Sequence, residues 1–470
     1  MTNAAIISHE NRPETQRAPW LAEARALVLL GAPLILTQVG QMAMVTTDVM
    51  MVGRLGQNAL AAATLGSVLY ISAWVVGFGP ALAVSPVIAH VLGARPDEIS
   101  EVRAAVRMGL WAVALLCIPL LGLLLFTEGL LLLAGQEPLL AKAAAGYVRV
   151  LALGLPFTLG FMVLRNFVTA LQRPRVPMVI IFLMVGLNVI GNYAFIFGHF
   201  GMPRLGLPGS AVSTAAANVL SFAALAAVVL MLPPFRRYRV FADFLTLDKA
   251  KLAELSRLGF SIGLAVIFET TLFNAAALLV GRFGAESLAG HQIALNAAAI
   301  TFMVPLGIGT AATIRVGLAA GARDSAGVWR AGLTALVIGA GFMMFCGLLF
   351  AVLPLQVASL YLPDAESNAG ALAFAVVYLR VAAVFQLFDG IQVIGINILR
   401  GLKDAAGPMW LAAASYWLVG FPLAVVLGFA FHMGGLGVWI GLAVSLAVAA
   451  LVMVLRFVHM SSRLPLALQI

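Results

Sequence analysis

Three carboxylates lie inside long apolar segments of the chain, at Asp48, Glu269 and Asp389, while the other acidic residues lie in or near the polar breaks. A charged carboxylate at the middle of a bilayer-spanning helix costs about 2.5–3.5 kcal/mol on insertion scales, so it persists mainly where it faces protein or a water-filled cavity. Such groups bind cations or protons, or they accept hydrogen bonds that hold helices together. We interpret the set of three as cation or proton sites of a membrane transporter.

Two of these acids have neighbours on the same helix face. Phe273 follows Glu269 by four residues. Gln386 and Gln392 lie three residues to either side of Asp389, a spacing that places side chains together on a helix. Oxygen ligands of this kind suit a hard monovalent cation, and the carboxylates can equally hold a proton in a cavity of low dielectric constant. The ring could add a cation–π contact. Core packing of the ring and interhelical hydrogen bonds of the glutamines are the alternatives.

The third acid, Asp48, has amide and hydroxyl candidates on two later segments. Asn188 and Asn192 are four residues apart and therefore share a helix face. The following segment carries Ser213, Thr214 and Asn218. With the carboxylate these side chains could form a polar pocket, and bonds between helices are the equal alternative.

The composition requires these residues to be carried by membrane-spanning helices. The 470 residues are 62% hydrophobic and 10% charged, whereas ordinary soluble domains are about 25% charged. Stretches of 18 or more apolar residues cross a hydrocarbon core of about 30 Å, and in lipid they must be helical. We expect an all-α membrane protein with twelve transmembrane helices, near 26–51, 60–89, 104–127, 143–171, 176–198, 209–232, 258–281, 288–318, 331–355, 370–399, 409–431 and 435–458.

The basic residues predict the orientation of the chain. With the N-terminus in the cytoplasm, 21 of the 28 Lys and Arg residues, Arg400 among them, fall in cytoplasmic segments and three in outer loops. This bias predicts that both termini are cytoplasmic. The net charge of +9 is then a topology signal and a contact with anionic lipid, and we expect no nucleic-acid partner. Cys117 and Cys346 lie within apolar segments, which disfavours a disulfide or a metal site.

The two halves of the chain repeat each other on either side of a basic loop. The Val-Gly-Arg motif at Arg54 recurs at Arg282, an offset of 228 residues, and the motif at Arg149 recurs at Arg380, an offset of 231. Halves of equal topology should be related by an axis along the membrane normal, with the substrate path between them. The expected divisions are a cytoplasmic tail (1–25), an N-lobe (26–232), a cytoplasmic inter-lobe loop (233–257), a C-lobe (258–458) and a second cytoplasmic tail (459–470).

The repeat makes the three acids unequal, because none of them is duplicated. The positions equivalent to Asp48, Glu269 and Asp389 hold Ala276, Gln41 and Thr158. The simplest interpretation is one acidic site in each lobe. Gln41, together with Gln292 and Asn296 on one face of the eighth apolar segment, is a further candidate for lining a cavity.

Absent motifs narrow the function classes. The sequence has no GxxxxGK[ST] phosphate loop, no HExxH motif, no aspartate-rich diphosphate–magnesium motif and no repeated filter-like loop. Direct use of ATP, a membrane enzyme and a channel are therefore disfavoured. We expect no cofactor beyond a coupling ion, Na⁺ or H⁺, and the only metal candidates are Glu269 and Asp389 as ligands of a monovalent cation.

Five stretches together resemble one transporter family. They are Asp48-Val49-Met50-Met51-Val52-Gly53-Arg54-Leu55-Gly56, Phe268-Glu269-Thr270-Thr271-Leu272-Phe273, Ala289-Gly290-His291-Gln292-Ile293-Ala294, Phe385-Gln386-Leu387-Phe388-Asp389-Gly390-Ile391-Gln392 and Leu399-Arg400-Gly401-Leu402-Lys403-Asp404. Over roughly residues 25–460 the chain is similar to the multidrug and toxic compound extrusion (MATE) transporters of the NorM-like bacterial branch.

The resemblance implies a fold, an activity and site residues. It implies two six-helix lobes in a V around a central cavity, and export of lipophilic, often cationic compounds in exchange for inward Na⁺ or H⁺. It implies a cation site at Glu269 and Asp389 with Phe273 as a cation contact, and a coupling site at Asp48. Relatives with an acid in the fifth helix differ from this chain, which has asparagines there. We expect a monomer in the bacterial inner membrane, in contact with lipid.

The alternative is a flippase of the same wider superfamily that moves lipid-linked oligosaccharides. Such a protein should line its cavity with several basic residues that bind a diphosphate. Arg149, Arg165 and Arg380 are the basic residues within or at the ends of the apolar segments that leave room for this function.

Overall fold

The computed structural model describes residues 19–362 and 368–467, with side chains described up to residue 463. Within these ranges the chain is helical and contains no strand. The helices are α1 (Pro19–Gly53), α2 (Gln57–Ala94), α3 (Ser100–Leu125), α4 (Thr127–Leu133), α5 (Pro138–Ala152), α6 (Leu155–Ala170), α7 (Arg175–Phe197), α8 (Leu207–Met231), α9 (Pro233–Arg236), α10 (Lys249–Gly281), α11 (Ala285–Gly321), α12 (Ser325–Val352), α13 (Pro354–Ser359), α14 (Ala369–Gly401), α15 (Ala406–Ala414), α16 (Phe421–Val425) and α17 (Gly434–Ala467).

The predicted fold class is confirmed. The described residues contain 11 helices long and apolar enough to cross a membrane, or 12 when α5 and α6 count as one span. These two helices meet at an angle of 41°. Pro156, the second residue of α6, has no backbone N–H with which to continue the preceding helix. The span Ala406–Ala430 contains two π-helical turns. The first, Ser415–Gly420, separates α15 from α16, and the second, Val426–Ala430, follows α16.

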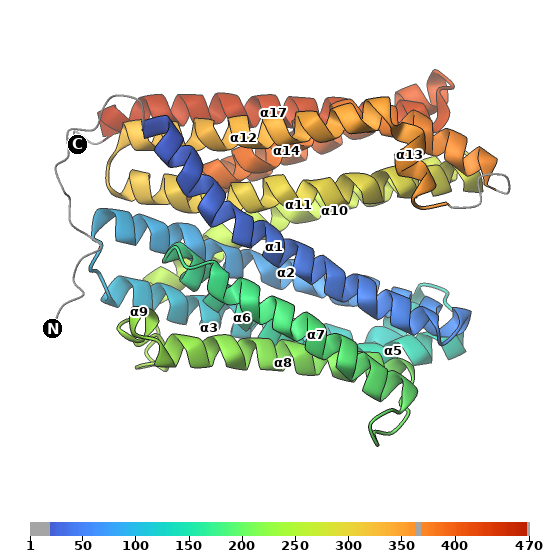
Figure 1. The fold of residues 1–470 in the computed structure, drawn as a ribbon, viewed down its shortest axis with the longest axis horizontal. Helices are drawn as coiled ribbons and strands as arrows, with labels where there is room; N and C mark the ends of the chain where they lie inside the picture. The colour runs from blue at the N-terminus through green and yellow to red at the C-terminus, as the bar shows by residue number, and fades with distance from the viewer. Residues whose placement is uncertain (1–18, 363–367, 468–470) are drawn as a thin grey trace.

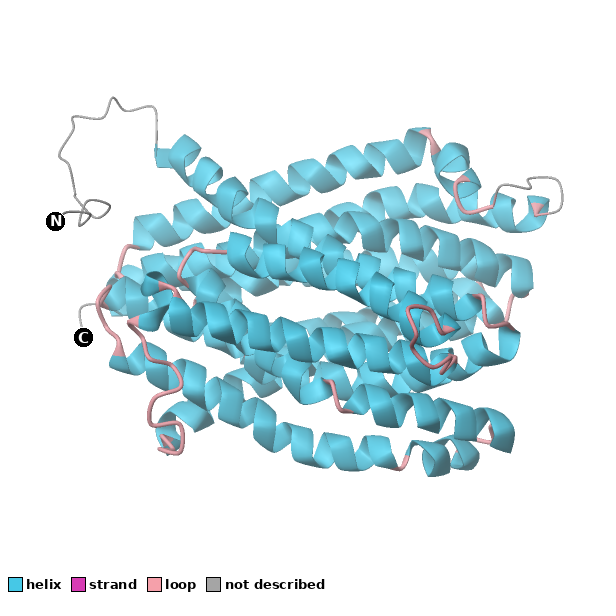
Figure 2. Ribbon diagram, turned by 60° about the horizontal axis from the view of Figure 1, so that its bottom comes forward, coloured by secondary structure: helices cyan, strands magenta, loops and turns pink. Residues whose placement is uncertain are grey.

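The long helices run side by side along the length of the molecule, and the loops gather at its two ends (Figure 2). We call one of these ends the terminal end, because α1 begins there and α17 finishes there (Figure 1). The start of α1 and the finish of α17 extend into segments predicted as tails, and residues 1–18 and 468–470 of those tails lie outside the described residues. The predicted inter-lobe loop likewise contains α9 and the first turns of α10.

The two halves of the chain form two lobes with separate apolar cores. The helices of α2–α8 lie on one side and those of α11–α17 on the other, and α1 runs obliquely over both (Figure 1). Leu27 and Leu34 at the start of α1 belong to the core of the second half. Their repeat equivalents, Leu255 and Ile262 of α10, belong to the core of the first half. The first helix of each half therefore crosses to the opposite lobe.

The lobes are in close contact where α2 meets α11 near the terminal end. A Cβ atom added at Gly93 would lie 2.1 Å from the carbonyl oxygen of Leu318. A Cβ atom added at Gly321 would lie 2.2 Å from the carbonyl oxygen of His90. Gly93 and Gly321 are repeat equivalents, as are His90 and Leu318. The contact is thus symmetric, and it depends on the missing side chain of glycine. Toward the far end the helices of the two lobes diverge (Figure 1).

Candidate functional site

A hydrogen-bonded cluster joins α1, α7 and α8 around Asp48. The Asn192 Nδ2 atom donates to Asp48 Oδ1 at 2.5 Å, and Thr214 Oγ1 donates to Asp48 Oδ2 at 2.8 Å. Asn188 completes the ring, because its Oδ1 accepts from Asn192 and its Nδ2 donates to Thr214, both at 3.2 Å. Both asparagines are buried. Four of the residues expected to form a polar pocket therefore do lie together, and we name them the Asp48 cluster.

Close packing of α7 on α8 places this cluster. A Cβ atom added at Gly191 would lie 2.5 Å from Ser213 Oγ, so the helices approach where α7 has no side chain. The same hydroxyl donates to the main-chain oxygen of Asn188 at 3.0 Å. Another predicted member, Asn218, lies elsewhere. Its side-chain nitrogen lies beside Gly154 at the break between α5 and α6.

The Asp48 cluster has the chemistry of a cation or proton site. The donors to the carboxylate are neutral, and within the described part of the chain no lysine or arginine bonds to it. The Oδ1 atom of Asn192 is buried and has no hydrogen-bond partner among these residues. A negative charge with a spare oxygen ligand beside it is what a small cation requires.

A second polar cluster lies in the other lobe, on α14 around Asp389. Asp389 is 6% exposed, and Gln386 and Gln392 are fully buried. Thr301 donates to the Oε1 atom of Gln386. Gln392 Nε2 donates to the Tyr416 hydroxyl at 2.7 Å. Three atoms remain without a partner among the described residues: Asp389 Oδ1, Gln392 Oε1 and Gln386 Nε2.

Unpaired oxygens at this depth are informative, because buried polar atoms in proteins are nearly always hydrogen-bonded. A bound cation would satisfy the two oxygens, and a proton on Asp389 would let its carboxyl act as a donor. Among the described residues, no three His, Cys, Asp or Glu side chains lie close enough together to hold a metal ion. A site here therefore relies on carboxylate and amide oxygens, which suits a hard cation and disfavours a transition metal.

Gln392 links this cluster to a cavity between the lobes, because it lines the cavity together with Glu269 and Phe273 of α10 and Arg400 of α14. The Phe273 ring packs edge-on against Phe385 with centroids 6.1 Å apart. The predicted neighbours on α10 therefore face the same space.

The central cavity has a volume of about 380 Å³ and is walled by both lobes. Side chains of α1, α2 and α6 form one wall, and those of α10, α11 and α14 form the other. Of the remaining cavity candidates, Gln41 lines it. Gln292 and Asn296 are exposed and are not among the lining residues, and Asn296 Nδ2 donates to the main-chain oxygen of Gln292 at 2.8 Å.

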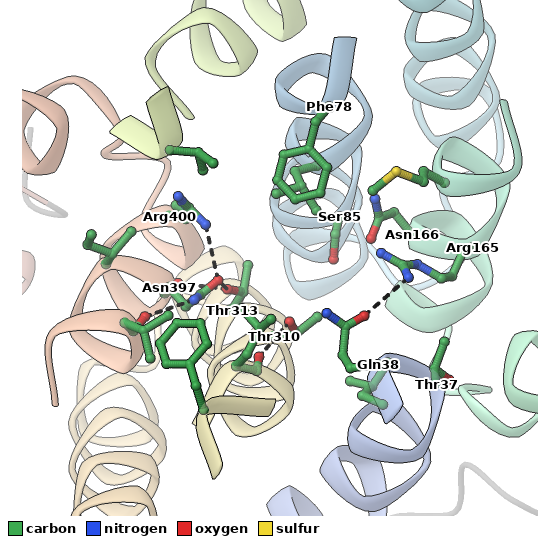
Figure 3. Close-up of a pocket in the computed structure, with 18 of the residues that line it drawn as sticks. Thr37, Gln38, Phe78, Ser85, Arg165, Asn166, Thr310, Thr313, Asn397 and Arg400 are labelled. Carbon is green, nitrogen blue, oxygen red and sulfur yellow. Dashed lines mark hydrogen bonds between the residues drawn. The ribbon is translucent and has the colours of Figure 1, made fainter. Parts of the chain in front are cut away.

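Two arginines lie in the cavity wall. Arg165 is the basic residue of the flippase alternative that does line the cavity, and Arg400 was not predicted as a site residue. Arg165 of α6 and Arg400 of α14 project from opposite walls (Figure 3). The basic-residue count places Arg400 in a cytoplasmic segment, but the side chain belongs to the last turn of α14 and is 9% exposed. The missed signal was its spacing from Asp389, because positions 389, 393, 396 and 400 follow one face of a helix.

A protein-family model agrees with this architecture. The model described as MatE matches residues 33–194 and 261–426. The chain belongs to the MatE family. The two matched stretches start 228 residues apart, which is the offset of the internal repeat. Thr214 and Asn218 fall between them, so the MatE stretches contain the acid and the asparagines of the Asp48 cluster but not its threonine.

Curated relatives match nearly the whole MatE-family chain. "Probable multidrug resistance protein NorM" of Mesorhizobium japonicum is 46% identical over 94% of this chain and 96% of its own length. Proteins of the same name are 38% identical in Brucella suis, covering 93% of each chain, and 40% identical in Pseudomonas aeruginosa, covering 95% of this chain and 91% of the other.

Solved structures support the MatE fold at lower identity. An outward-facing multidrug resistance MATE family transporter of the MOP superfamily has a TM-score of 0.84, with 21% identity over 96% of this chain and 99% of the other. A MATE protein in complex with MaL6 has a TM-score of 0.85, with 21% identity over 94% and 97%. These neighbours share the two-lobed helical fold of this chain.

Proposed function

We propose that this protein is a multidrug efflux antiporter that exports lipophilic and cationic compounds in exchange for inward Na⁺ or H⁺. One observation carries the proposal: Glu269 and Gln392 both line the cavity shared by the two lobes, and Gln392 belongs to the cluster in which an oxygen of Asp389 and an oxygen of Gln392 have no partner among the described residues. The names of the relatives, which are multidrug resistance proteins, support the same function.

The two binding events compete through charge. A cationic substrate in the cavity is attracted to the Glu269 carboxylate, and a cation or proton bound at Glu269 and Asp389 removes that attraction. Loading of the coupling ion therefore favours release of the substrate. A ligand shifts the balance between two conformations only by its differential affinity for them. The Asp48 cluster is a second place where such loading can act, with one carboxylate and amide oxygens.

The close contact of α2 with α11 is the interface that must separate during transport. When Gly93 and Gly321 lie against the opposite helix, the lobes are closed at the terminal end. Opening the cavity to that side requires this contact to separate, and alternating access is the exchange between these two arrangements. No cofactor is needed beyond the coupling ion.

We assign the terminal end to the cytoplasm of a bacterial cell, so that the protein spans the inner membrane. The support is the distribution of basic residues, which favours cytoplasmic placement of that end. The conformation described here is then closed to the cytoplasm. We take the monomer in contact with membrane lipid as the working unit.

A direct test is the accumulation of a cationic dye in cells that lack their own efflux pumps. Cells expressing the protein should retain less dye, and Glu269→Gln or Asp389→Asn should restore retention at equal protein levels. Asn218→Ala, which lies outside both clusters, is the matched control. Unchanged efflux by both acid variants at equal protein levels would contradict the proposal.

A lipid-linked oligosaccharide flippase is the second candidate, and Arg165 and Arg400 are the observation that favours it. The other two basic candidates do not line the cavity. Arg149 pairs with Glu128 at 3.3 Å, and Arg380 is exposed. Two arginines in a cavity that also contains the Glu269 carboxylate form a weak diphosphate site, so efflux remains the better proposal.

A further inference from the structure

A second cavity, which we call the terminal pocket, lies near the terminal end where α7 begins beside α1 (Figure 1). Its volume is about 480 Å³. It is lined by Ala26, Leu29, Leu30, residues 172–176 and Arg315. Its walls therefore come from α1, from the turn between α6 and α7, and from α11. All of these residues differ from those that line the central cavity, so the two cavities are separate.

The charged residues that line the terminal pocket are three arginines. Arg173 and Arg175 are exposed, and neither side chain has an ion-pair or hydrogen-bond partner among the described residues. Arg315 differs, because it donates to both carboxylate oxygens of Glu23, at 2.7 and 2.5 Å. The positive charge of Arg315 is thus balanced. The positive charges of Arg173 and Arg175 are available to a ligand.

The depth of the pocket matches the polar surface of a bilayer. Arg315 lies 12 residues beyond the middle of α11, which is about 18 Å along the helix axis. For a helix centred in the bilayer, the headgroup layer lies about 15–22 Å from the centre. The α1 wall of the pocket is apolar, and Leu29 in it is 54% exposed. An exposed apolar side chain on a membrane-spanning helix is in position to contact an acyl chain.

We propose that the terminal pocket binds the phosphate of an anionic phospholipid, with an acyl chain along Leu29. Arginine binds phosphate oxygens through paired N–H groups, and basic pockets between membrane helices bind anionic headgroups. A zwitterionic lipid fits less well, because the described lining residues offer no carboxylate to its ammonium group and Glu23 is held by Arg315. The inference does not depend on the proposed efflux, since lipid binding is measured without transport.

A lipid in the terminal pocket contacts both lobes. Arg173 and Arg175 belong to the turn between α6 and α7 of the first lobe. Arg315 belongs to α11, and Leu30 of α1 lies in the core of the second half. These walls stay together only while the lobes are in contact at the terminal end. The bound lipid therefore favours the closed arrangement of that end, because its affinity for that arrangement is higher.

Thermal unfolding of the purified, delipidated full-length protein in detergent tests the binding. Phosphatidylglycerol, which is anionic, and phosphatidylcholine, which is zwitterionic, are added with the same acyl chains and at equal concentration. A ligand of the folded state raises the unfolding temperature. Phosphatidylglycerol should therefore raise it by several degrees more than phosphatidylcholine does. In the double variant Arg173→Gln/Arg175→Gln this difference between the lipids should fall to about half or less.

Three controls make the result specific. Arg236→Gln/Arg257→Gln removes the same charge from exposed positions outside the pocket and should keep the wild-type difference. Arg173→Lys/Arg175→Lys keeps the charge but loses the planar fork, so its difference should be intermediate. This variant also carries the test if the glutamine variant does not fold. Inorganic phosphate without lipid should protect the protein little, because it has no acyl chain to place along α1.

A distance measurement tests the contact with both lobes. Nitroxide labels are placed at Arg95→Cys and Arg323→Cys, with the native cysteines replaced by alanine, and the protein is reconstituted in nanodiscs. Phosphatidylglycerol should raise the ratio of short to long label distances several-fold over phosphatidylcholine. Arg173→Gln/Arg175→Gln should remove that effect.

Equal unfolding temperatures with the two lipids would overturn the proposal, as would equal behaviour of the pocket variant and the Arg236→Gln/Arg257→Gln control. Equal protection by inorganic phosphate would overturn the assignment of the ligand as a lipid. A lipid preference in unfolding without any change in label distance would overturn the effect on closure. Dye accumulation in cells tests efflux separately, so failure of the lipid proposal leaves the efflux proposal standing.

Discussion

The side-chain amide of Asn192 donates a hydrogen bond of 2.5 Å to the Oδ1 atom of Asp48, across 144 residues of sequence. This bond ties the oblique helix α1 to α7 inside the first lobe. A single neutral donor holds each oxygen of the carboxylate. A cation or proton that binds at Asp48 would therefore change the bonds that join α1, α7 and α8.

Asn192→Ala should destabilise the protein and impair efflux. The substitution leaves the Oδ1 atom of Asp48 without its donor, and hydrogen bonds to charged groups contribute about 1.5–3 kcal/mol. Thermal unfolding in detergent should move to lower temperature, and dye efflux should fall several-fold. Asn218→Ala removes an equivalent amide group that lies outside the cluster, one helical turn beyond Thr214. It should leave the unfolding temperature and dye efflux near wild type. Equal effects of the two variants would contradict this role of the Asp48 cluster.

Gly93→Ala should hold the lobes apart at the terminal end. The added Cβ atom would lie 2.1 Å from a carbonyl oxygen, so the backbones of α2 and α11 must separate. We expect loss of transport and a longer distance between nitroxide labels on Arg95→Cys and Arg323→Cys, measured by pulsed electron resonance with Cys117 and Cys346 replaced by alanine.

The control for this variant is Gly122→Ala on α3, where a Cβ atom meets nothing within 4 Å. It should preserve transport and the label distance. An unchanged distance in Gly93→Ala would show that the contact of α2 with α11 does not set the closure of that end.

Glu23→Gln should lower stability more than the loss of an exposed ion pair does. Arg315 donates to both carboxylate oxygens of Glu23, at 2.7 and 2.5 Å, and joins the start of α1 to α11. Breaking a largely buried, bidentate pair costs about 3 kcal/mol, whereas exposed pairs contribute about 0–1 kcal/mol. Glu128→Gln breaks the exposed pair with Arg149 and is the matched control. The unfolding temperatures of the two variants in detergent decide the question, and equal shifts would argue against a special role for the α1–α11 pair.

Tyr416→Phe should weaken binding of the coupling ion. The hydroxyl of Tyr416 accepts from Gln392 Nε2 at 2.7 Å and thereby fixes the unpaired Oε1 atom of the amide. Without it the amide can rotate, so release of a bound dye should need several-fold more Na⁺ or H⁺. Tyr378→Phe removes a hydroxyl of the same lobe that is bonded to Ser287 at 2.6 Å. In this control, dye release should need the same Na⁺ or H⁺ concentration as in wild type. A wild-type ion requirement in Tyr416→Phe would contradict the assignment of Gln392 to the ion site.

Much of this architecture could be predicted from the sequence. Apolar length predicts the spans because each must cross the hydrocarbon core, and the offset of 228 residues predicts the paired lobes. The spacing of Asn188 and Asn192 predicts one helix face, and the structure places both at Asp48. Helical periodicity is a local property, so it is read reliably from local sequence.

What escaped prediction depends on contacts between helices. The crossing of α1 and α10 to opposite lobes follows from packing that no single segment encodes. Asn218 shares a helix face with Thr214 but lies one turn too far along α8 to reach the carboxylate. From the sequence, Arg400 is an ordinary cytoplasmic basic residue, and only the packing of the two lobes places it in the cavity wall. Hydropathy describes the neighbours of a residue along the chain. It does not contain the neighbours that other helices bring to it across the cavity.

The most direct test of antiport is exchange in proteoliposomes, with Na⁺ and pH gradients imposed separately. One of the two gradients should drive movement of a cationic dye against its concentration through the wild-type protein. Glu269→Gln should abolish the gradient dependence, and Asn218→Ala should retain it. Dye movement that ignores both gradients, or a Glu269→Gln protein that couples as well as wild type, would contradict the account.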